Sequence, residues 1–314
     1  MKSGFAGIIG RPNVGKSTLL NSILGEKIAI TTDKPQTTRN SIRGIYTEHT
    51  EDGDSSQIVF IDTPGIHKAH NKLGAAMDDI AIKTYKEVDV ILFLVDGGPD
   101  KGRGDTYILE MIKDVETPKF LVINKVDTMD PEEFKETYDV YEKMGIFDEI
   151  FGISALKGTH VKKLVKAIQG YLEEGPMFFP EDMVTDHPER FIVSEIIREK
   201  LLMYLNEEVP HGVAVEIESY KEDPKLTEIG AVIYCERKSH KGIIIGKQGK
   251  KLKGIGKSAR LEIEALLGVR VYLELFVKVK ENWRDSDFAI SNFGYSEDLS
   301  LIHISEPTRL LSIS

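Results

Sequence analysis

The sequence predicts two successive domains, an α/β domain with a mostly parallel sheet and then a smaller α+β domain. Over residues 1–173, short apolar runs typical of buried strands alternate with helical patterns. This alternation favours a parallel sheet with helices on both faces. It stops at residues 174–189, which carry prolines, a glycine and acidic side chains. The change predicts a domain boundary with an ordered, extended linker.

Composition is that of an ordinary globular protein, with 314 residues, 41% of them hydrophobic, and a net charge of −10. No apolar run has the length of a membrane span, and the chain enters a predicted strand directly, so we expect no membrane helix and no targeting peptide. The single cysteine, Cys235, lies in an apolar run and excludes a disulfide framework. The single cysteine fits the reducing cytoplasm. The negative net charge argues against nucleic-acid binding over the whole protein surface.

A glycine-containing loop is the centre of the first domain. Residues 10–17 read Gly-Arg-Pro-Asn-Val-Gly-Lys-Ser and match the phosphate-binding P-loop spacing, between a strand predicted at 5–9 and a helix predicted at 18–24. Gly10 and Gly15 let backbone N–H groups turn toward phosphate oxygens, and the helix dipole adds to their attraction. An inert surface turn is the alternative for the loop taken alone.

Three oxygen-bearing side chains are candidates for a magnesium site. The Ser17 hydroxyl is expected to bind Mg²⁺, while Lys16 reaches the β- and γ-phosphates of a nucleotide. The polar loop 33–40 offers a second hydroxyl, for which Thr38 is the first choice and Thr37 the alternative.

The third candidate follows a strand predicted at 58–61, which ends in Asp62-Thr63-Pro64-Gly65. The Asp62 carboxylate is placed to hold Mg²⁺ through water, and the Gly65 N–H to contact a γ-phosphate. Taken alone, this tetrapeptide is a common turn.

A candidate motif for selecting the nucleotide base follows a strand predicted at 119–123 and reads Asn-Lys-Val-Asp. The Asp127 carboxylate can accept from both N1–H and the 2-amino group of guanine, and adenine would leave it unpaired. Such discrimination can reach roughly 10⁴–10⁵. Asn124 and Lys125 are expected to tie this loop to the P-loop. After a strand predicted at 150–153, the Ala155 N–H is expected to meet the guanine O6.

The remaining elements of the first domain complete the alternation. They are a strand at 88–96 and helices at 106–113, 131–144 and 160–172. Every candidate motif then falls at the carboxyl end of a strand, where ligands bind in parallel sheets. This shared placement argues against the alternative that the four motifs are unrelated surface turns that match by chance.

The second half predicts the order helix, strand, strand, helix, glycine loop, helix, strand. The ranges are 191–205, 213–217, 230–235, 240–245, 246–249, 250–267 and 269–279. The glycine loop, Gly-Lys-Gln-Gly, lets an RNA backbone approach without Cβ obstruction. From Arg237 to Arg260 the chain carries nine basic residues and no acid, a focused positive patch. A solvated helix face is the alternative.

These motifs resemble those of a known family. Residues 5–156 resemble a translation-factor-related GTPase through the segments GRPNVGKS, PQTTR, DTPG, NKVD and SAL, at 10–17, 35–39, 62–65, 124–127 and 154–156. The Gln-Thr-Thr-Arg loop resembles the Era family in particular. Residues 190–281 resemble a type II KH domain, and the segment 278–284 again resembles Era. A P-loop GTPase domain followed by a KH domain is that family's architecture, and the resemblance covers residues 1 to about 298.

The resemblance implies a GTPase that hydrolyses GTP to GDP and phosphate, binds small-subunit ribosomal RNA near its 3′ end, and acts in assembly of the small ribosomal subunit. It implies Mg²⁺ as cofactor, with K⁺ as a further candidate through Asn13. The implied catalytic residues are Lys16, Thr38 and Gly65, and the metal ligands Ser17, Thr38 and Asp62. The implied nucleotide-binding residues are Gly10, Asn13, Val14, Gly15, Lys16, Ser17, Thr18, Asp62, Gly65, Asn124, Lys125, Asp127, Ser154, Ala155 and Leu156. The implied RNA-binding residues are Lys241, Gly246, Lys247, Gln248, Gly249, Lys250, Lys251, Lys253 and Lys257.

One position limits the expected rate. Ile66 stands where Ras-like switches carry a catalytic glutamine, and no side chain there can orient water.

Other functions stay open at this point. An RNA chaperone with little or no GTPase activity is the main alternative, followed by an ATP-driven enzyme and a membrane-recruited signalling GTPase. We expect a monomer, with peripheral contact at the inner face of the cell membrane left as an alternative.

The end of the chain divides into two segments. Residues 282–298 form a C-terminal segment, and residues 299–314 are expected to be a non-native tail. The latter string corresponds to a transposon-based sequencing adapter read in frame, so we expect it to form no part of the native fold. A natural variant tail is the alternative, which genomic reads across the stop codon would test.

Overall fold

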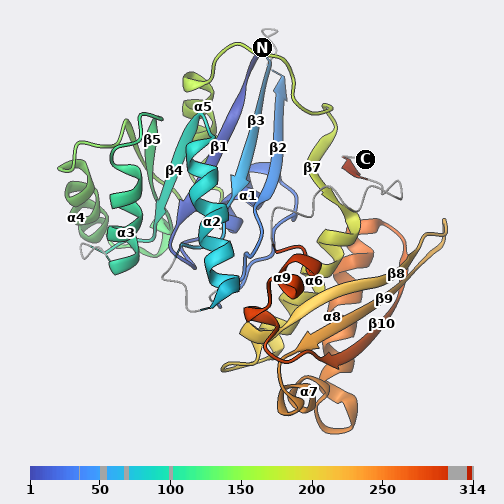
Figure 1. Cartoon of the computed structure of the whole chain (residues 1–314). Coiled ribbons are helices and arrows are strands. Elements are labelled where there is room, and N and C mark those ends of the chain that lie inside the picture. The colour runs from blue at the N-terminus through green and yellow to red at the C-terminus, as the bar shows by residue number, and fades with distance from the viewer. Residues whose placement is uncertain (35, 50–54, 67–70, 99–101, 296–309, 313–314) are drawn as a thin grey trace.

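The computed structural model confirms an α/β domain followed by an α+β domain (Figure 1). It describes residues 1–34, 36–49, 55–66, 71–98, 102–295 and 310–312. Pro35 of the predicted PQTTR loop lies outside the described residues, as do 296–298 of the C-terminal segment and 299–309 and 313–314 of the expected non-native tail. Within the described part of the chain, every helix is too short or too polar to cross a bilayer.

The first domain is built on a six-stranded sheet whose strand order is β2-β3-β1-β4-β5-β6. The strands are β1 (Lys2–Gly10), β2 (Ile42–His49), β3 (Ser55–Asp62), β4 (Val90–Val95), β5 (Lys119–Ile123) and β6 (Glu149–Gly152). All neighbours are parallel except β2 and β3, which are antiparallel. Strand β2 was not predicted, because as an edge strand it keeps several polar side chains partly exposed.

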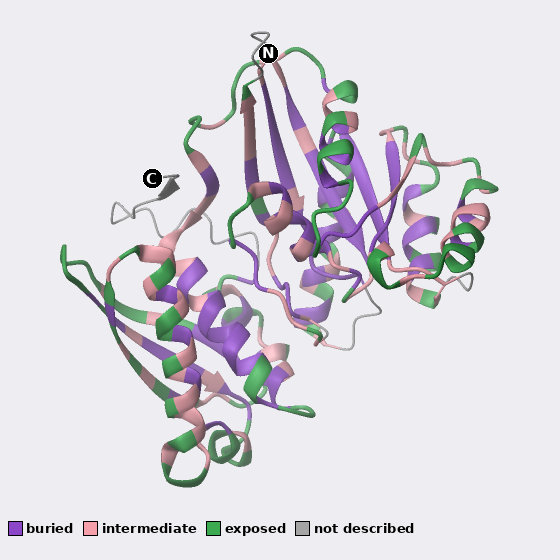
Figure 2. Cartoon of the chain, turned by 180° about the vertical axis from the view of Figure 1, so that it is seen from behind, coloured by how far each residue is buried: buried purple, intermediate pink, exposed green. Residues whose placement is uncertain are grey.

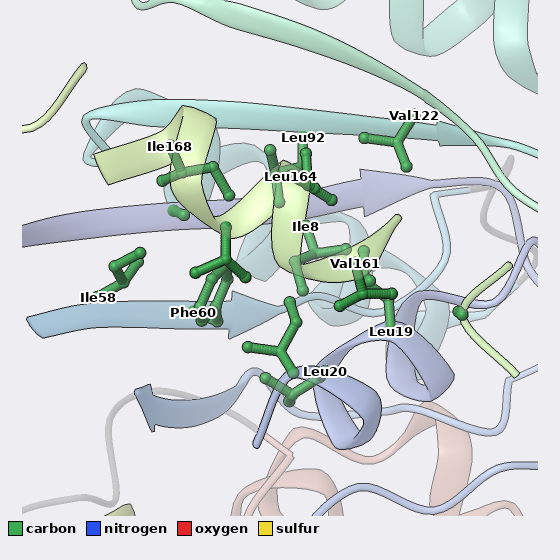
Figure 3. Packing of buried hydrophobic residues seen from close by; sticks show 14 of the residues in the cluster. Ile8, Leu19, Leu20, Ile58, Phe60, Leu92, Val122, Val161, Leu164 and Ile168 are labelled. Carbon is green, nitrogen blue, oxygen red and sulfur yellow. The ribbon is translucent and has the colours of Figure 1, made fainter. Parts of the chain in front are cut away.

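Helices cover both faces of this sheet, as predicted. One face carries α1 (Lys16–Leu24) and α5 (Val161–Tyr171), and the other carries α2 (Lys72–Lys86), α3 (Arg103–Ile112) and α4 (Pro131–Glu142). Figure 3 shows the first of these interfaces, where Leu164 and Ile168 of α5 meet strand residues such as Ile8 and Phe60. Helix α2 was not predicted.

The segment between the domains is ordered against the first domain. The Gln57 side chain on β3 accepts from the N–H groups of Phe178 and Phe179, at 2.8 and 3.0 Å. Strand β7 (Met183–Pro188) then runs beside β2, with the Thr185 hydroxyl donating to the Arg43 carbonyl at 2.6 Å. The described end of the chain, β11 (Leu310–Ser312), pairs antiparallel with β7.

The second domain has the predicted order of elements. They are α6 (Glu189–Tyr204), β8 (Ala214–Lys221), β9 (Leu226–Cys235), α7 (Lys238–Ile245), α8 (Lys250–Leu267) and β10 (Arg270–Val279). The sheet has the order β10-β9-β8, with β9 parallel to β10 and antiparallel to β8. Helices cover one side of it (Figure 2), and Cys235 is fully buried in their shared core, as expected for a structural thiol.

The C-terminal segment packs against both domains. The Trp283 ring is fully buried and its Nε1–H donates to the Gly212 carbonyl at 2.9 Å. Helix α9 (Asp287–Asn292) follows, and its Ile290 lies in one apolar cluster with Leu73 and Met77 of α2. The C-terminal segment therefore connects α2, the helix that follows residues 62–65, to the second domain.

Candidate functional site

The P-loop joins β1 to α1 at the point where the sheet order changes direction, with β3 on one side of β1 and β4 on the other. Gly15 has φ 102°, and a Cβ there would lie 2.2 Å from Asn124 Nδ2, so the loop has no room for a side chain. Gly65 faces it from the end of β3, where a Cβ would lie 2.8 Å from Pro12.

The predicted phosphate and metal side chains converge at this loop. Lys16 is buried and its Nζ donates to the carbonyls of Gly10 and Arg11, at 3.1 and 2.8 Å. The Ser17 hydroxyl donates to Asp62 Oδ2 at 2.5 Å and lies 2.9 Å from Thr38 Oγ1. Burial lowers the pKa of Lys16 to about 8 and raises the pKa of Asp62 to about 6, because both charges are removed from water.

These donors fit a magnesium ion held together with nucleotide phosphates. Two hydroxyls and one carboxylate are the hard oxygen ligands that Mg²⁺ prefers. Asp62 Oδ1 is buried and has no hydrogen-bond partner among the described residues. A cation there would satisfy that oxygen and hold Asp62 in its charged form.

The loop between α1 and β2 separates the two candidate threonines. The Thr37 hydroxyl donates to the Lys34 carbonyl at 2.6 Å and lies 2.6 Å from Thr32 Oγ1, inside its own loop. Thr38 instead faces Ser17. A pocket runs between this loop and the P-loop. It is lined by predicted residues, Asn13, Gly15, Lys16, Ser17, Thr18, Thr37, Thr38, Gly65 and Lys125, and by five not predicted, Pro12, Ile30, Thr31, Thr32 and Gln36.

The Asn-Lys-Val-Asp loop is bonded to the P-loop as expected. Asn124 Nδ2 donates to the Val14 carbonyl at 2.8 Å, and Lys125 Nζ donates to the Asn13 carbonyl at 2.8 Å. Asp127 lies exposed in the short turn after β5, and Ser154 is buried at the end of β6.

The Ala155 amide is bonded to the Asn-Lys-Val-Asp loop. Its N–H donates to Asn124 Oδ1 at 2.9 Å, so a guanine O6 at this position would have to share that donor. Leu156 follows, and 76% of its surface is exposed.

Sequence reasoning missed an ion-pair network behind the P-loop. Arg11 donates to Asp105 on α3 at 2.7 Å and to Asp96 at the end of β4 at 2.8 Å. Asp96 also accepts from Lys125 at 3.0 Å. This carboxylate therefore links the phosphate loop to the base loop. A charged residue at the end of the strand predicted at 88–96 was the available signal.

Ile66 is almost fully buried, in one apolar cluster with Ile9, Ala81 and Tyr85. Its side chain belongs to the core of the domain and offers no hydrogen bond to a water molecule.

Two buried arginines join the Thr38 loop to the second domain. Arg39 donates to the carbonyls of Val213 and His211, at 2.6 and 3.0 Å, and lies over the Trp283 ring. In the reverse direction Arg198 of α6, fully buried, donates to the Thr37 carbonyl.

Arg198 is held by a bidentate pair with Glu195, at 2.7 and 2.5 Å. The following residue, Glu199, is also buried and accepts from the Thr31 N–H at 2.9 Å and from Lys27 at 2.8 Å. The structure adds direct bonds from α6 to the Thr38 loop.

The glycine loop of the second domain joins α7 to α8. Gly246, Gln248 and Gly249 all have positive φ, at 71°, 52° and 72°. The predicted basic residues lie on or beside this loop, with Lys241, Lys247, Lys250, Lys253 and Lys257 exposed and Lys251 partly exposed.

A groove of about 550 Å³ lies next to this loop, between α8 and β10. It combines cations with apolar side chains and small glycines, and its lining residues are Gly249, Leu252, Lys253, Gly256, Lys257, Arg260, Val271, Tyr272, Leu273 and Leu275. Most of these were not predicted, because residues from a helix and a later strand form one surface only after folding.

Comparison with known proteins agrees with this geometry. The family model described as 50S ribosome-binding GTPase matches residues 5–125, and the KH domain model matches residues 208–284. GTPase Era of Clostridioides difficile (strain 630) is 57% identical, covering 94% of this chain and 99% of its own. GTPase Era of Alkaliphilus oremlandii (strain OhILAs) is 59% identical with the same coverage.

Two solved structures are similar over the same length. A single-residue variant of Aquifex aeolicus Era, bound to GDP·AlF4⁻, has a TM-score of 0.89 and 43% identity, covering 94% of this chain and 100% of its own. An Era structure in complex with MgGDPNP and nucleotides 1506–1542 of 16S ribosomal RNA has the same TM-score and identity, covering 94% of this chain and 99% of its own. The chain belongs to the Era family of GTPases.

Proposed function

We propose that this protein is a GTP-hydrolysing switch that binds small-subunit ribosomal RNA near its 3′ end and acts in assembly of the small ribosomal subunit. The relatives are named as GTPases, and one related structure holds an analogue of GTP together with a fragment of 16S ribosomal RNA. Both domains of those proteins are present here, because the matches cover 99% of the relatives' own length.

The observation that carries this proposal is the position of Thr38. Its hydroxyl lies 2.9 Å from Ser17 Oγ at the P-loop, while its neighbour Arg39 is bonded to two carbonyls of the second domain. A loop with one residue at the phosphate site and the next in the RNA-binding domain can transmit the nucleotide state. An RNA chaperone with an inert first domain would have no need of this contact.

Each predicted residue then has a role in holding the nucleotide. The N–H groups of the P-loop and Lys16 bind the phosphates, and Asp127 reads the base. Thr38 rather than Thr37 completes the metal shell with Ser17 and Asp62, because the Thr37 hydroxyl is bonded within its own loop. Mg²⁺, when bound, neutralises charge on the phosphate oxygens.

Hydrolysis at this site relies on positioning and electrostatics. Lys16 and the Gly65 backbone stabilise charge that develops on the γ-phosphate, in a site made by buried groups. Because Ile66 is part of the core, no side chain at that position orients the attacking water. Intrinsic turnover is therefore slow.

The second domain binds RNA through the glycine loop and the groove between α8 and β10. Lys247, Lys250, Lys253 and Lys257 supply phosphate contacts, and the apolar wall of the groove accommodates bases. We propose residues 1–173, 190–281 and 282–298 as GTPase domain, KH domain and C-terminal segment of a cytoplasmic monomer, with residues 299–314 as a non-native tail.

Coupling between the two sites is the test of this function. A nonhydrolysable GTP analogue is expected to raise the affinity for 16S ribosomal RNA over that with GDP by a few-fold to about a hundredfold. The reason is that contacts with the γ-phosphate order the Thr38 loop. This loop is bonded to α6 of the second domain, because Arg198 donates to the Thr37 carbonyl. RNA affinity is measured at fixed salt with each nucleotide, and GTP turnover with and without RNA.

A double replacement can weaken the coupling between the nucleotide site and the RNA site without unfolding the protein. Replacing Glu195→Gln and Arg198→Met together removes the bond from Arg198 to the Thr37 carbonyl, and it leaves neither charge of this buried ion pair alone. The variant is expected to reduce the difference between the RNA affinity with the GTP analogue and the RNA affinity with GDP. The matched control is Glu218→Gln with Lys278→Met, an exposed ion pair of the same domain. Equal affinities in the unmodified protein, with no effect of RNA on turnover, would favour the RNA chaperone instead.

The rate of GTP turnover is also expected to depend on the monovalent cation present. We propose that potassium stimulates GTP turnover through Asn13, which is exposed at the mouth of the pocket and whose Nδ2 donates to the Asp33 carbonyl at 2.6 Å. Turnover is measured in KCl and NaCl at equal ionic strength, with Asn13→Gly as the variant because Asn13 has φ 67°. An equal turnover rate in KCl and NaCl would contradict a role for potassium.

A further inference from the structure

Three stretches of more than twenty residues in this chain contain no acidic side chain, at 1–25, 150–172 and 237–261. The first contains the P-loop, and the third contains the glycine loop of the KH domain. The stretch 150–172 has no role in either site beyond its first few residues. It carries four lysines in a protein whose net charge is −10.

These four lysines lie on the surface of the GTPase domain. Lys162, Lys163 and Lys166 belong to α5, Lys157 precedes the helix, and all four are exposed. The opposite side of α5 is buried in the core around Leu164, so the helix is strongly two-sided. We call these four residues the α5 lysine face.

No residue of the α5 lysine face forms an ion pair within the described part of the chain. Other surface lysines are paired, as Lys72 is with Asp287 and Lys278 with Glu218. Neighbouring lysines three and four residues apart repel each other on a helix. An unpaired cluster of one sign, in an acidic protein, matches a polyanionic partner.

The α5 lysine face is on the same side of the molecule as the KH helices. Helix α5 packs against α1, and Lys27, just after α1, pairs with Glu262 of α8 at 2.5 Å. Figures 1 and 2 agree on this arrangement: both α5 and α8 lie behind their sheets in one view and in front in the other. Helix α4, which carries five acidic residues, covers the other face of the sheet.

We propose that the α5 lysine face is a second contact for the RNA held by the KH groove, and that it binds phosphate groups of the ribosomal RNA outside the segment in the groove. The proposal rests on the proposed RNA-binding function. Lysine ammonium groups act as point charges, so this contact adds affinity and salt dependence without reading sequence. It extends the footprint from the KH domain onto the GTPase domain.

The test measures binding to purified small ribosomal subunits over a range of salt concentrations. The variant is Lys162→Gln, Lys163→Gln and Lys166→Gln together, which keeps long side chains that favour a helix. Loss of three phosphate contacts is expected to reduce the slope of log K against log salt by about 2–3, since each contact contributes roughly 0.7–0.9. Affinity at about 50 mM salt is expected to fall about tenfold or more.

The matched control is Lys135→Gln with Lys143→Gln, two exposed lysines at α4 on the other face of the same domain. It is expected to leave the slope and the affinity unchanged. If the α5 variant binds subunits with the slope and affinity of the unmodified protein, or if the control loses as much, the proposal is wrong.

A short RNA separates this contact from the KH groove. A single-stranded RNA of about ten nucleotides from the 3′ end of 16S ribosomal RNA is expected to bind the α5 variant and the unmodified protein equally. An equal loss on this short RNA would contradict a separate contact. Failure of the unmodified protein to bind it would contradict the proposed RNA function instead. A loss confined to vesicles of phosphatidylglycerol, with subunit binding intact, would overturn RNA as the partner.

Discussion

GTP turnover is expected to fall by at least about 10²–10³-fold when Lys16 is replaced by alanine, the range found when one group that stabilises a charged transition state is removed. Lys16 is buried at the phosphate loop, and no other described lysine lines that pocket except Lys125 at its edge. Replacing Ser17 with alanine is expected to have an effect of the same order, because it removes one of the proposed metal ligands and the partner of Asp62.

The measurement is single-turnover GTP hydrolysis by the full chain, with RNA affinity determined on the same preparations. RNA binding in the absence of nucleotide is expected to persist in both variants, since the groove between α8 and β10 has its own core. Lys86→Ala, an exposed lysine at the end of α2, is the matched control. Turnover that survives in Lys16→Ala would place the phosphate site elsewhere.

The second large effect concerns the choice of base. Asp127→Asn is expected to weaken GTP binding by about 10² or more and to gain relative affinity for xanthosine triphosphate. The 2-oxo group of xanthine accepts from an amide, whereas the 2-amino group of guanine donates to a carboxylate. Because Asp127 is exposed, its replacement removes no core contact.

Affinities for GTP and xanthosine triphosphate are compared in the unmodified protein, in Asp127→Asn and in Asp130→Asn. Asp130 lies three residues further on, at the start of α4, and is also exposed. Its replacement is expected to leave the guanine preference unchanged. If Asp127→Asn keeps the full preference for guanine, Asp127 does not read the base.

Much of the fold could be predicted from local patterns. Strand β5 and helix α8 have the predicted bounds, because each is a run of one periodicity ended by a clear stop signal. Helix α8, for example, begins after Gly249 and ends at Gly268, and both glycines have positive φ. Strand β2 and helix α2 were missed, because β2 is an edge strand and α2 carries lysines, aspartates and alanines between its few large apolar residues.

The sequence by itself determined the class of the protein and its site motifs. The motifs at 10–17, 62–65, 124–127 and 154–156 are short, and each directly follows an apolar run. Parallel strands bring their carboxyl ends to one edge of the sheet, so the spacing of these segments was enough to place them together.

Only the tertiary structure decided how that site is connected to the rest of the chain. The distinction between Thr37 and Thr38 depends on which hydroxyl turns toward Ser17. The bonds of Arg39 and Arg198 between the domains join residues 174 and 161 positions apart. Such contacts leave no periodicity in the sequence, because a buried arginine bonded to a carbonyl looks the same in the chain as a solvated one. Folding alone brings the carbonyls of one domain to the charged groups of the other.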